Sequence, residues 1–314
     1  MEIDIASHDT ESHHRGGPRT TSAMTGVTNA AVHRGRVRLS DGADIALAGA
    51  GSGPVVLFLH GIGGSSRQWE RALLSLAPRH CALAWDARGY GESRGAPVSR
   101  FGDFADDLFG VLHALGIARA LVVGHSMGGR ILLEAARIDQ SRFAGMVLSG
   151  AQSAYLEHMT PAERQSYVEN RQALFAGEAM RPDAAARVAQ GVLAPGTGDE
   201  IVDEMVESFM ALKREGYLAA LAASVGMDAR DVLGRITVPT RVVGGSLDTV
   251  CPAEETRRIA EAIGQGPAEI LQGVGHMPNL EAPDRFLAAI GPFLAAHASQ
   301  ATSADSAALL GAAT

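Results

Sequence analysis

The sequence predicts an α/β fold: a mostly parallel, doubly wound sheet with a helical cap inserted between two of its strands. Short apolar runs alternate along the chain with stretches of helical periodicity. Runs that are apolar at every position indicate strands buried on both faces, as in a parallel sheet covered by helices on two sides. One interval, residues 155–233, breaks this alternation because it holds helical patterns and no strand-like run.

The elements of the sheet and its covering helices are expected in alternating order. An opening hairpin is predicted around Asp41-Gly42, where a turn signal separates two short strands. The strands are expected at residues 36–40, 45–48, 55–59, 81–85, 120–123, 146–148, 241–243 and 269–271. The helices between them are expected at residues 67–76, 101–115, 129–137, 254–263 and 283–295.

The interval 155–233 is predicted to form a helical cap over the carboxyl edge of the sheet, where doubly wound folds bind their ligands. Helices are expected at 161–176, 183–193 and 201–223, with a break at 195–198. Methionines in and beside the cap are interpreted as core filler, with some of them open to lining a pliable pocket. The cap arginines are expected on solvated faces, and one of them is left open as a ligand for a substrate carboxylate: Arg164, Arg171, Arg181, Arg187 and Arg214.

The predicted domain organisation is one core divided by the cap. Residues 34–154 and 234–297 form the core, and residues 155–233 form the cap. Residues 1–33 and 298–314 are polar or Ala/Ser-rich and lack periodicity, so both are expected to be disordered tails. The histidines of the first tail (His8, His13 and His14) lack a surrounding carboxylate or cysteine framework, and a solvated tail is favoured over a metal site.

Composition excludes several classes of protein. The 314 residues carry a net charge of −8. Binding to nucleic acid or anionic lipid would need a positively charged surface, which this composition does not favour. The two cysteines, Cys81 and Cys251, form neither a CxxC motif nor a disulfide framework, so a reduced, cytoplasmic setting is expected. No signal peptide or membrane span is predicted, because no apolar stretch is long enough. Monomer and homodimer both remain open.

A nucleophile is predicted at Ser126. It stands in Gly124-His125-Ser126-Met127-Gly128, directly after an expected strand and before an expected helix, which is the context of a G-x-S-x-G nucleophile elbow. The flanking glycines let strand and helix approach each other without Cβ clashes. The turn therefore holds the Ser126 hydroxyl at the end of the strand, near a helix N-terminus that stabilises negative charge.

The base and its orienting acid are predicted in the loops after the last two strands. His276 follows the strand at 269–271, and Asp248 follows the strand at 241–243. The chain order Ser126, Asp248, His276 matches the Ser…Asp/Glu…His order of one serine hydrolase fold. Carboxyl ends of parallel strands meet at one sheet edge, so the three side chains are expected to meet there.

Donors for an oxyanion are predicted in the loop after the strand at 55–59. Its glycines expose backbone N–H groups at the same edge, so the backbone N–H groups of Ile62 and Met127 are expected to form the oxyanion hole. Gly61, His125 and Met277 adjoin these groups and are expected to contact the substrate. No metal site and no cofactor is predicted. Asp86 and Arg88 are interpreted as a structural ion pair or loop brace.

Five motifs together resemble the α/β-hydrolase superfamily: HGIGG at 60–64, DARGYGES at 86–93, GHSMGG at 124–129, GGSLD at 244–248 and GHMPNLEAP at 275–283. The resemblance covers about residues 36–296 and implies the α/β-hydrolase fold. It places the family's nucleophile on Ser126, its acid on Asp248, its base on His276 and its oxyanion donors on Ile62 and Met127.

Within the superfamily the chain is similar to bacterial 3-oxoadipate enol-lactonases, carboxylesterases and meta-cleavage C–C hydrolases. Met277 departs from the C–C hydrolases, which usually carry an aromatic residue after the histidine. The expected substrate is a small-molecule carboxylic ester or lactone, which water cleaves through an acyl-enzyme. A C–C hydrolase or cofactor-free lyase on the same fold stays open, as does a ligand-sensing protein on a hydrolase scaffold.

Overall fold

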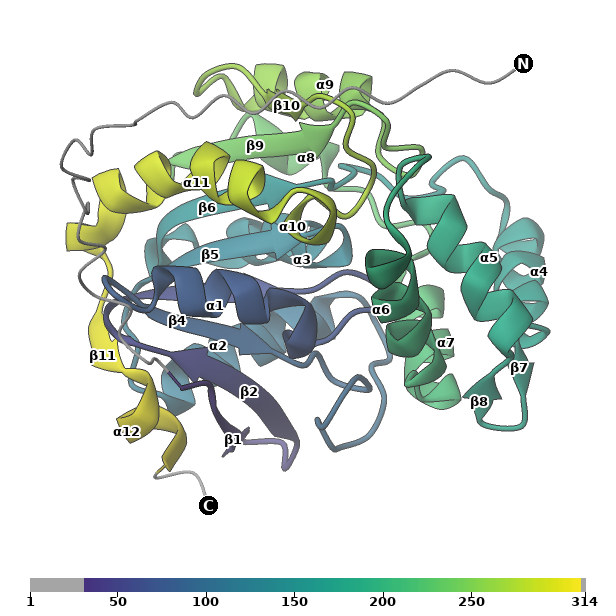
Figure 1. Cartoon of the computed structure of the whole chain (residues 1–314), viewed down its shortest axis with the longest axis horizontal. Helices are drawn as coiled ribbons and strands as arrows, with labels where there is room; N and C mark the ends of the chain where they lie inside the picture. The colour runs from purple at the N-terminus through teal and green to yellow at the C-terminus, as the bar shows by residue number, and fades with distance from the viewer. Residues whose placement is uncertain (1–30, 312–314) are drawn as a thin grey trace, which may run out of the picture.

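The computed structural model describes residues 31–311, and within them nine strands form one sheet (Figure 1). Eight strands follow the order β1-β2-β4-β3-β5-β6-β9-β10, with β11 added beside β3. From β4 to β10 all neighbours on this path are parallel, and β2 is antiparallel to both β1 and β4. The strands are β1 (His33–Arg38), β2 (Asp44–Ala50), β3 (Ser52–Leu59), β4 (Cys81–Trp85), β5 (Ala120–His125), β6 (Phe143–Ser149), β9 (Thr240–Gly245), β10 (Glu269–Leu271) and β11 (Ser303–Asp305).

Helices cover both faces of the sheet, as the fully apolar strands require. The helices α1 (Glu70–Leu76) and α11 (Pro283–His297) pack on one face. The helices α2 (Gly102–Ala114), α3 (Met127–Ile138) and α9 (Ala253–Ile263) pack on the other. Neighbouring strand residues point to opposite faces, so each strand contributes to both cores. The predicted fold, a mostly parallel doubly wound sheet, is confirmed.

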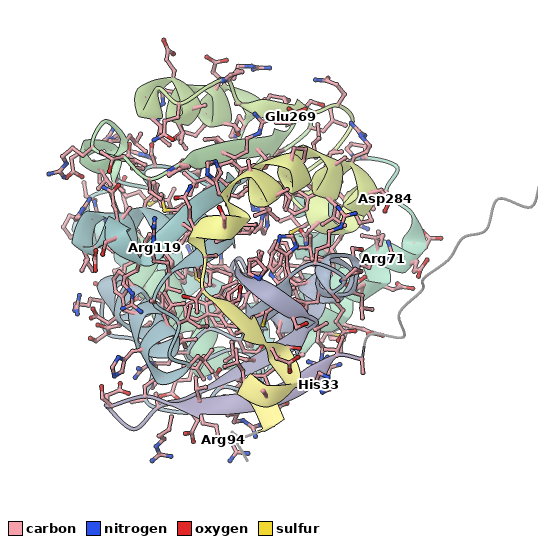
Figure 2. The ribbon with its side chains drawn as sticks, turned by 90° about the vertical axis from the view of Figure 1, so that its left-hand side faces the viewer. His33, Arg71, Arg94, Arg119, Glu269 and Asp284 are labelled. Carbon is pink, nitrogen blue, oxygen red and sulfur yellow. The ribbon has the colours of Figure 1, made fainter. Side chains whose placement is uncertain are left out.

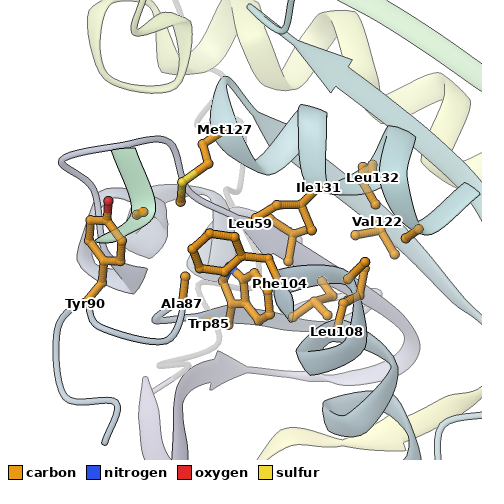
Figure 3. Close-up of a cluster of buried hydrophobic side chains, with 14 of the residues drawn as sticks. Leu59, Trp85, Ala87, Tyr90, Phe104, Leu108, Val122, Met127, Ile131 and Leu132 are labelled. Atoms are coloured by element: carbon orange, nitrogen blue, oxygen red, sulfur yellow. The ribbon is translucent and has the colours of Figure 1, made fainter. Parts of the chain in front are cut away.

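The larger core lies between the sheet and the helices α2 and α3 (Figure 3). Phe104 and Leu108 of α2 and Ile131 of α3 meet Leu59 and Trp85 of the strands, and all five side chains are fully buried. This packing fixes the start of α3 against the carboxyl ends of β3 and β5. The position of the residue between β5 and α3 is therefore set by a rigid layer rather than by a loop.

The cap interval, residues 155–233, is mostly helical, and most of it lies at one end of the sheet, on the right in Figure 1, whereas its last helix, Arg230–Leu233, lies beside α3 and α9. Its elements are α4 (Pro161–Gln172), β7 (Phe175–Ala176), β8 (Ala179–Met180), α5 (Pro182–Val192), α6 (Asp199–Met210), α7 (Arg214–Ser224) and α8 (Arg230–Leu233). The Thr160 side chain and Glu163 cap the start of α4 reciprocally.

Two expectations about the cap are wrong. The helix expected at 201–223 is two helices, since Lys213 takes an extended conformation between α6 and α7. No glycine or proline marks this break, and the buried Leu212 and the Lys213 Nζ bond to the Ser93 carbonyl at 3.2 Å hold it instead. The helix expected at 161–176 ends at Gln172, because the short hairpin β7–β8 turns at Gly177, whose φ is 65°.

The expected disorder of residues 298–314 is also wrong for residues 298–311. These residues continue α11 through a 3-10 turn (Ala298–Gln300) into β11 and α12 (Ser306–Gly311). β11 pairs antiparallel with the start of β3, and Leu310 of α12 is buried against the first hairpin. Figure 2 shows this segment in yellow, descending from α11 toward His33. Long-range pairing orders a stretch that has no periodicity of its own.

The remaining described elements are the 3-10 turns at Ser66–Trp69 and Gln140–Arg142 and the short helix α10 (Pro278–Glu281). The expected N-terminal tail, residues 1–33, lies outside the described residues except for its last three, of which His33 begins β1. None of the helices in residues 31–311 is long and apolar enough to cross a bilayer.

Candidate active site

Ser126 occupies a strained turn between β5 and α3. Its φ is 52° and its ψ is −112°, a backbone conformation that non-glycine residues rarely adopt. The Ser126 N–H donates to the Ser149 carbonyl at 2.8 Å, and the Ser126 carbonyl accepts from the Arg130 N–H at 3.1 Å. These bonds to β6 and to the first turn of α3 hold the strained residue in place. The geometry is that of the predicted nucleophile elbow.

The glycines of the elbow are required by close backbone approach. A Cβ on Gly124 would lie 2.4 Å from the Gly128 carbonyl oxygen, and a Cβ on Gly128 would lie 2.3 Å from the Leu59 carbonyl oxygen. Real Cβ atoms essentially never come so near to another heavy atom. Helix α3 can therefore start directly beside the ends of β3 and β5, with its N-terminal N–H groups near Ser126.

His276 and Asp248 form a buried hydrogen-bonded pair in the loops after β10 and β9. His276 Nδ1 lies 2.8 Å from Asp248 Oδ2, and the two side chains are 6% and 1% exposed. A carboxylate only accepts, so Nδ1 carries the proton and Nε2 has the free lone pair. The other carboxylate oxygen, Oδ1, accepts from the N–H groups of Val250 at 2.8 Å and Cys251 at 2.7 Å. Asp248 thus fixes the tautomer of His276.

The nucleophile elbow and the His276 loop are neighbours. The ring of His125, the residue before Ser126, lies 4.8 Å from the His276 ring. A Cβ on Gly150 would lie 3.4 Å from both rings and from Asp248 Oδ2. Among the described residues the Ser126 hydroxyl makes no hydrogen bond, so a Ser126–His276 bond is not formed in this structure. Such bonds often tighten only with substrate in place.

The loop after β3 lies against the nucleophile. A Cβ on Gly61 would lie 3.0 Å from the Ser126 Cβ and 3.3 Å from the His125 ring. Ile62 follows in this loop, and Met127 opens α3 directly after Ser126. The two backbone segments that carry the predicted oxyanion donors therefore both adjoin Ser126, and the role of their N–H groups in binding an oxyanion stays a prediction.

His60 links the loop after β3 to the loop after β4 by two hydrogen bonds. Its Nδ1 donates to the Gly61 carbonyl at 2.8 Å, and its Nε2 accepts from the Ala87 N–H at 2.9 Å, which assigns the proton to Nδ1. Burial lowers the pKa of His60, so the neutral form is favoured. His60 is a structural tie between the loops after β3 and β4.

Glu281 is a site residue that sequence reasoning missed. Its Oε2 accepts from the Gly275 N–H at 2.9 Å and from the Ala194 N–H of the cap at 2.8 Å. Its Oε1 accepts from the Met277 N–H at 2.8 Å. The carboxylate therefore binds the backbone on both sides of His276 and ties this loop to the cap. The available signal was an acidic residue five positions after the predicted base.

The three residues expected to contact substrate lie around this centre. Gly61 faces Ser126, as described above. His125 is buried, with both ring nitrogens unpartnered among the described residues, and burial holds its pKa well below the ordinary value. Met277 is buried in the larger core beside the His276 loop. Their contact with substrate stays a prediction. Within residues 31–311 no group of three or more His, Cys, Asp or Glu residues could hold a metal ion.

Comparison with known proteins identifies the family. A model of the alpha/beta hydrolase family matches residues 56–289. The chain belongs to this family. It is 30% identical over 264 residues to the dihydrolipoyllysine-residue acetyltransferase component of the acetoin cleaving system of Pseudomonas putida, which covers 80% of this chain and 66% of that protein.

Two further likenesses concern ester chemistry. This α/β hydrolase is 25% identical over 238 residues to 3-oxoadipate enol-lactonase 2 of Acinetobacter baylyi, covering 74% of this chain and 85% of that enzyme. The solved structure of a thermophilic esterase from Thermogutta terrifontis superposes with a TM-score of 0.76 at 26% identity, over 84% of this chain and 98% of that one. The predicted resemblance to enol-lactonases and esterases is confirmed.

The loop after β4 of this α/β hydrolase is braced as predicted. Asp86 is buried and accepts from the backbone N–H groups of Ser66 at 2.7 Å and Glu92 at 2.8 Å. Arg88 pairs with Asp107, with Nε to Oδ2 at 2.9 Å, and with Asp41. Asp86 and Arg88 therefore do not pair with each other. Both act on loop structure, and neither contacts Ser126, Asp248 or His276.

Proposed function

We propose that this α/β hydrolase is a serine hydrolase that cleaves a small-molecule carboxylic ester or lactone through an acyl-enzyme. The observation that carries the proposal is the strained Ser126 beside the buried Asp248–His276 pair, with His276 in the tautomer that leaves Nε2 free. A serine hydroxyl becomes a nucleophile when such a base takes its proton. The likeness to an enol-lactonase and to an esterase supports this choice of reaction.

Each residue of the candidate site has a role in the proposed reaction. Ser126 Oγ attacks the carbonyl carbon while His276 Nε2 takes its proton, and Asp248 stabilises the resulting imidazolium. The backbone N–H groups of Ile62 and Met127 hold the oxyanion. His276 then protonates the leaving alcohol or enol, which completes the acyl-enzyme. The same histidine activates water, which attacks the acyl group and releases the acid together with free Ser126.

A serine-directed probe tests the proposal. A fluorophosphonate is expected to label the native protein on Ser126 and to leave a Ser126→Ala variant unlabelled, and the labelled peptide is identified by mass spectrometry. In Ser126→Ala, kcat for p-nitrophenyl acetate is expected to fall at least about 10³-fold, because triad members act as a unit. Equal labelling of both proteins, or near-native turnover in the variant, contradicts the assignment.

Ester cleavage and C–C cleavage are separated by substrate. The proposal expects turnover of aryl esters and lactones and none of vinylogous diketones, the substrates of C–C hydrolases. A protein that senses ligands would release at most one equivalent of p-nitrophenol without steady turnover. Turnover of vinylogous diketones, or release of a single equivalent of p-nitrophenol, would replace the proposed function. The fold and the geometry of the site would stay as described.

A further inference from the structure

The side chain of Arg130 is buried beside the candidate active site. Arg130 lies in the first turn of α3, where its N–H donates to the Ser126 carbonyl at 3.1 Å. The residue is 3% exposed. Its guanidinium carbon lies 4.2 Å from the centroid of the Tyr155 ring and 5.6 Å from that of Phe101. A cation is thus held among aromatic rings, one helical turn beyond the nucleophile.

No carboxylate within residues 31–311 pairs with Arg130, and Nη1 is a buried donor with no hydrogen-bond partner there. The groups that act electrostatically on it are Tyr155, Tyr90, Tyr167 and Cys251. Burial raises the pKa of the phenols Tyr90 and Tyr155, and it raises that of the Cys251 thiol to about 12. These three groups are neutral at pH 7 and supply no counter-charge.

Arg130 nevertheless keeps its own charge. Burial lowers its pKa to about 10, which leaves the guanidinium protonated at neutral pH. A buried guanidinium with an unsatisfied donor is costly unless an anion or acceptor completes it. Cation–π contacts with Tyr155 and Phe101 offset part of that cost. They do not satisfy the free N–H group, which has no acceptor among the described residues.

Arg130 belongs to the core helix α3, whereas Tyr155, whose ring it contacts, is the first residue of the cap interval. The Tyr155 backbone bonds to Met227 and Gly226 of the cap at 2.8 and 2.7 Å. The hydroxyls of Tyr155 and Tyr167 are 3.1 Å apart, and Arg171 Nη2 donates to the Tyr167 hydroxyl at 3.0 Å. The ring of Tyr155 thus contacts Arg130, and its hydroxyl pairs with that of Tyr167 in helix α4, which binds a second, half-buried guanidinium.

Within residues 31–311 a second unpaired group, the Tyr90 hydroxyl, lies near the loop that carries the predicted oxyanion donor Ile62. The ring of Tyr90 packs edge-on against His60 at 5.1 Å, and its hydroxyl is a second buried group without a hydrogen-bond partner among the described residues. Tyr90 and Met127 lie at the same end of the larger core (Figure 3). Among the described residues, an unpaired cation and an unpaired hydroxyl thus lie near the candidate site.

We propose that Arg130 binds a carboxylate of the substrate, so that the preferred substrate is an ester or lactone that also carries a free carboxylate group. Aromatic rings cover the face of the Arg130 guanidinium, and a planar carboxylate would bind the N–H groups along its edge. Tyr90 is the neighbouring donor for its second oxygen. This inference rests on the proposed esterase or lactonase function and adds the chemical class of the substrate.

The test compares two esters that differ only at the far end of the acyl chain. Mono-p-nitrophenyl glutarate carries a carboxylate where p-nitrophenyl valerate carries a methyl group. The ratio of their kcat/KM values is expected to favour the glutarate in the native enzyme. It is expected to fall at least about tenfold in Arg130→Met, which loses a charge-assisted hydrogen bond. Arg137→Met removes an exposed arginine from the same helix and is expected to keep the native ratio.

Binding of free glutarate separates the two proposals. Glutarate is expected to raise the Tm of the native protein and of Arg137→Met, but not that of Arg130→Met. Where Arg130→Met does not fold, Arg130→Lys replaces it and is expected to lose most of the glutarate preference, since lysine lacks the planar fork. An unchanged ester ratio and an unchanged Tm shift in the Arg130 variants overturn the carboxylate site. Failure of the native enzyme to cleave either ester, with the Tm shift intact, overturns only the proposed hydrolysis.

Discussion

Glu281 binds the backbone on both sides of His276. Its two carboxylate oxygens accept from the N–H groups of Gly275 and Met277 at 2.9 and 2.8 Å, and one of them also accepts from the cap residue Ala194. The backbone N–H of His276 in turn donates to the Val192 carbonyl of α5 at 2.9 Å. The position of the candidate base therefore depends on the cap as well as on the sheet.

We predict that Glu281→Gln lowers kcat for p-nitrophenyl acetate about tenfold or more, with a smaller change in KM. The amide nitrogen of glutamine cannot accept a hydrogen bond, so one N–H beside His276 loses its partner and the imidazole shifts. Steady-state kinetics and Tm are measured on the same samples. Glu254→Gln, at an exposed position on α9, is the control, and a Glu281→Gln variant with the native kcat would show that the His276 loop holds without Glu281.

We expect Asp248→Asn to lower kcat by about 10⁴-fold without unfolding the protein. The amide can donate to Nδ1, which favours the tautomer whose Nε2 carries the proton and cannot act as base. Circular dichroism confirms the fold, and p-nitrophenyl acetate hydrolysis gives the rate. Asp228→Asn, at a surface ion pair with Arg230, is expected to keep native turnover. A loss of less than about tenfold in Asp248→Asn would exclude Asp248 as the orienting acid.

Acidification below about pH 6.5 should destabilise the fold. His60 and His125 are fully buried, and burial lowers their pKa below the ordinary 6.5. Between the lowered folded pKa and 6.5, the unfolded chain binds more protons than the folded one. Stability is therefore fully present above about pH 6.5 and falls below it, by up to about 1.4 kcal/mol per pH unit for each histidine.

Urea unfolding between pH 7.5 and pH 5.5 measures this dependence. His60→Gln is expected to show a shallower fall than the native protein, whereas His113→Gln, at an exposed position on α2, is expected to follow the native curve. Stability that stays constant or rises over this interval would contradict burial of the two histidines in neutral form.

Leu310 tests whether the C-terminal segment is part of the core. Its side chain is 1% exposed, and it contacts the backbone region of Gly35 and Gly49 in the first hairpin. Leu310→Ala is expected to cost about 2–4 kcal/mol in the free energy of unfolding, as buried leucines do. Leu74→Ala, at a 42% exposed position on α1, should cost under about 1 kcal/mol. Equal, small effects of the two substitutions would restore the view of this segment as a loose tail.

Much of the fold followed from local pattern. The strand at 81–85 matches β4 residue for residue, because a run that is apolar at every position requires burial on both faces. The strand at 269–271 matches β10, although it begins with Glu269 and is only partly buried. The candidate site followed from topology: Ser126, Asp248 and His276 each follow a parallel strand, and the carboxyl ends of such strands meet at one edge. The structure adds the Asp248–His276 bond and the strain at Ser126, which spacing alone could not show.

Other features depend on partners that are distant in sequence. β11 reads Ser-Ala-Asp, which has no strand propensity, and exists because β3 offers it backbone hydrogen bonds. The turn between α6 and α7 has neither glycine nor proline and is held by contacts with the core.

By itself, the sequence determined the α/β alternation, the order of the candidate nucleophile, acid and base, and the family. Hydrophobic periodicity and strand–turn–helix motifs are local, so they can be recognised without knowing what packs against them. Only the tertiary structure decided which polar groups have partners. Glu281 accepts hydrogen bonds from backbone N–H groups on both sides of His276. Arg130 contacts aromatic rings and pairs with no carboxylate within the described residues. Burial and pairing are properties of a folded neighbourhood, which segments remote in the chain assemble together.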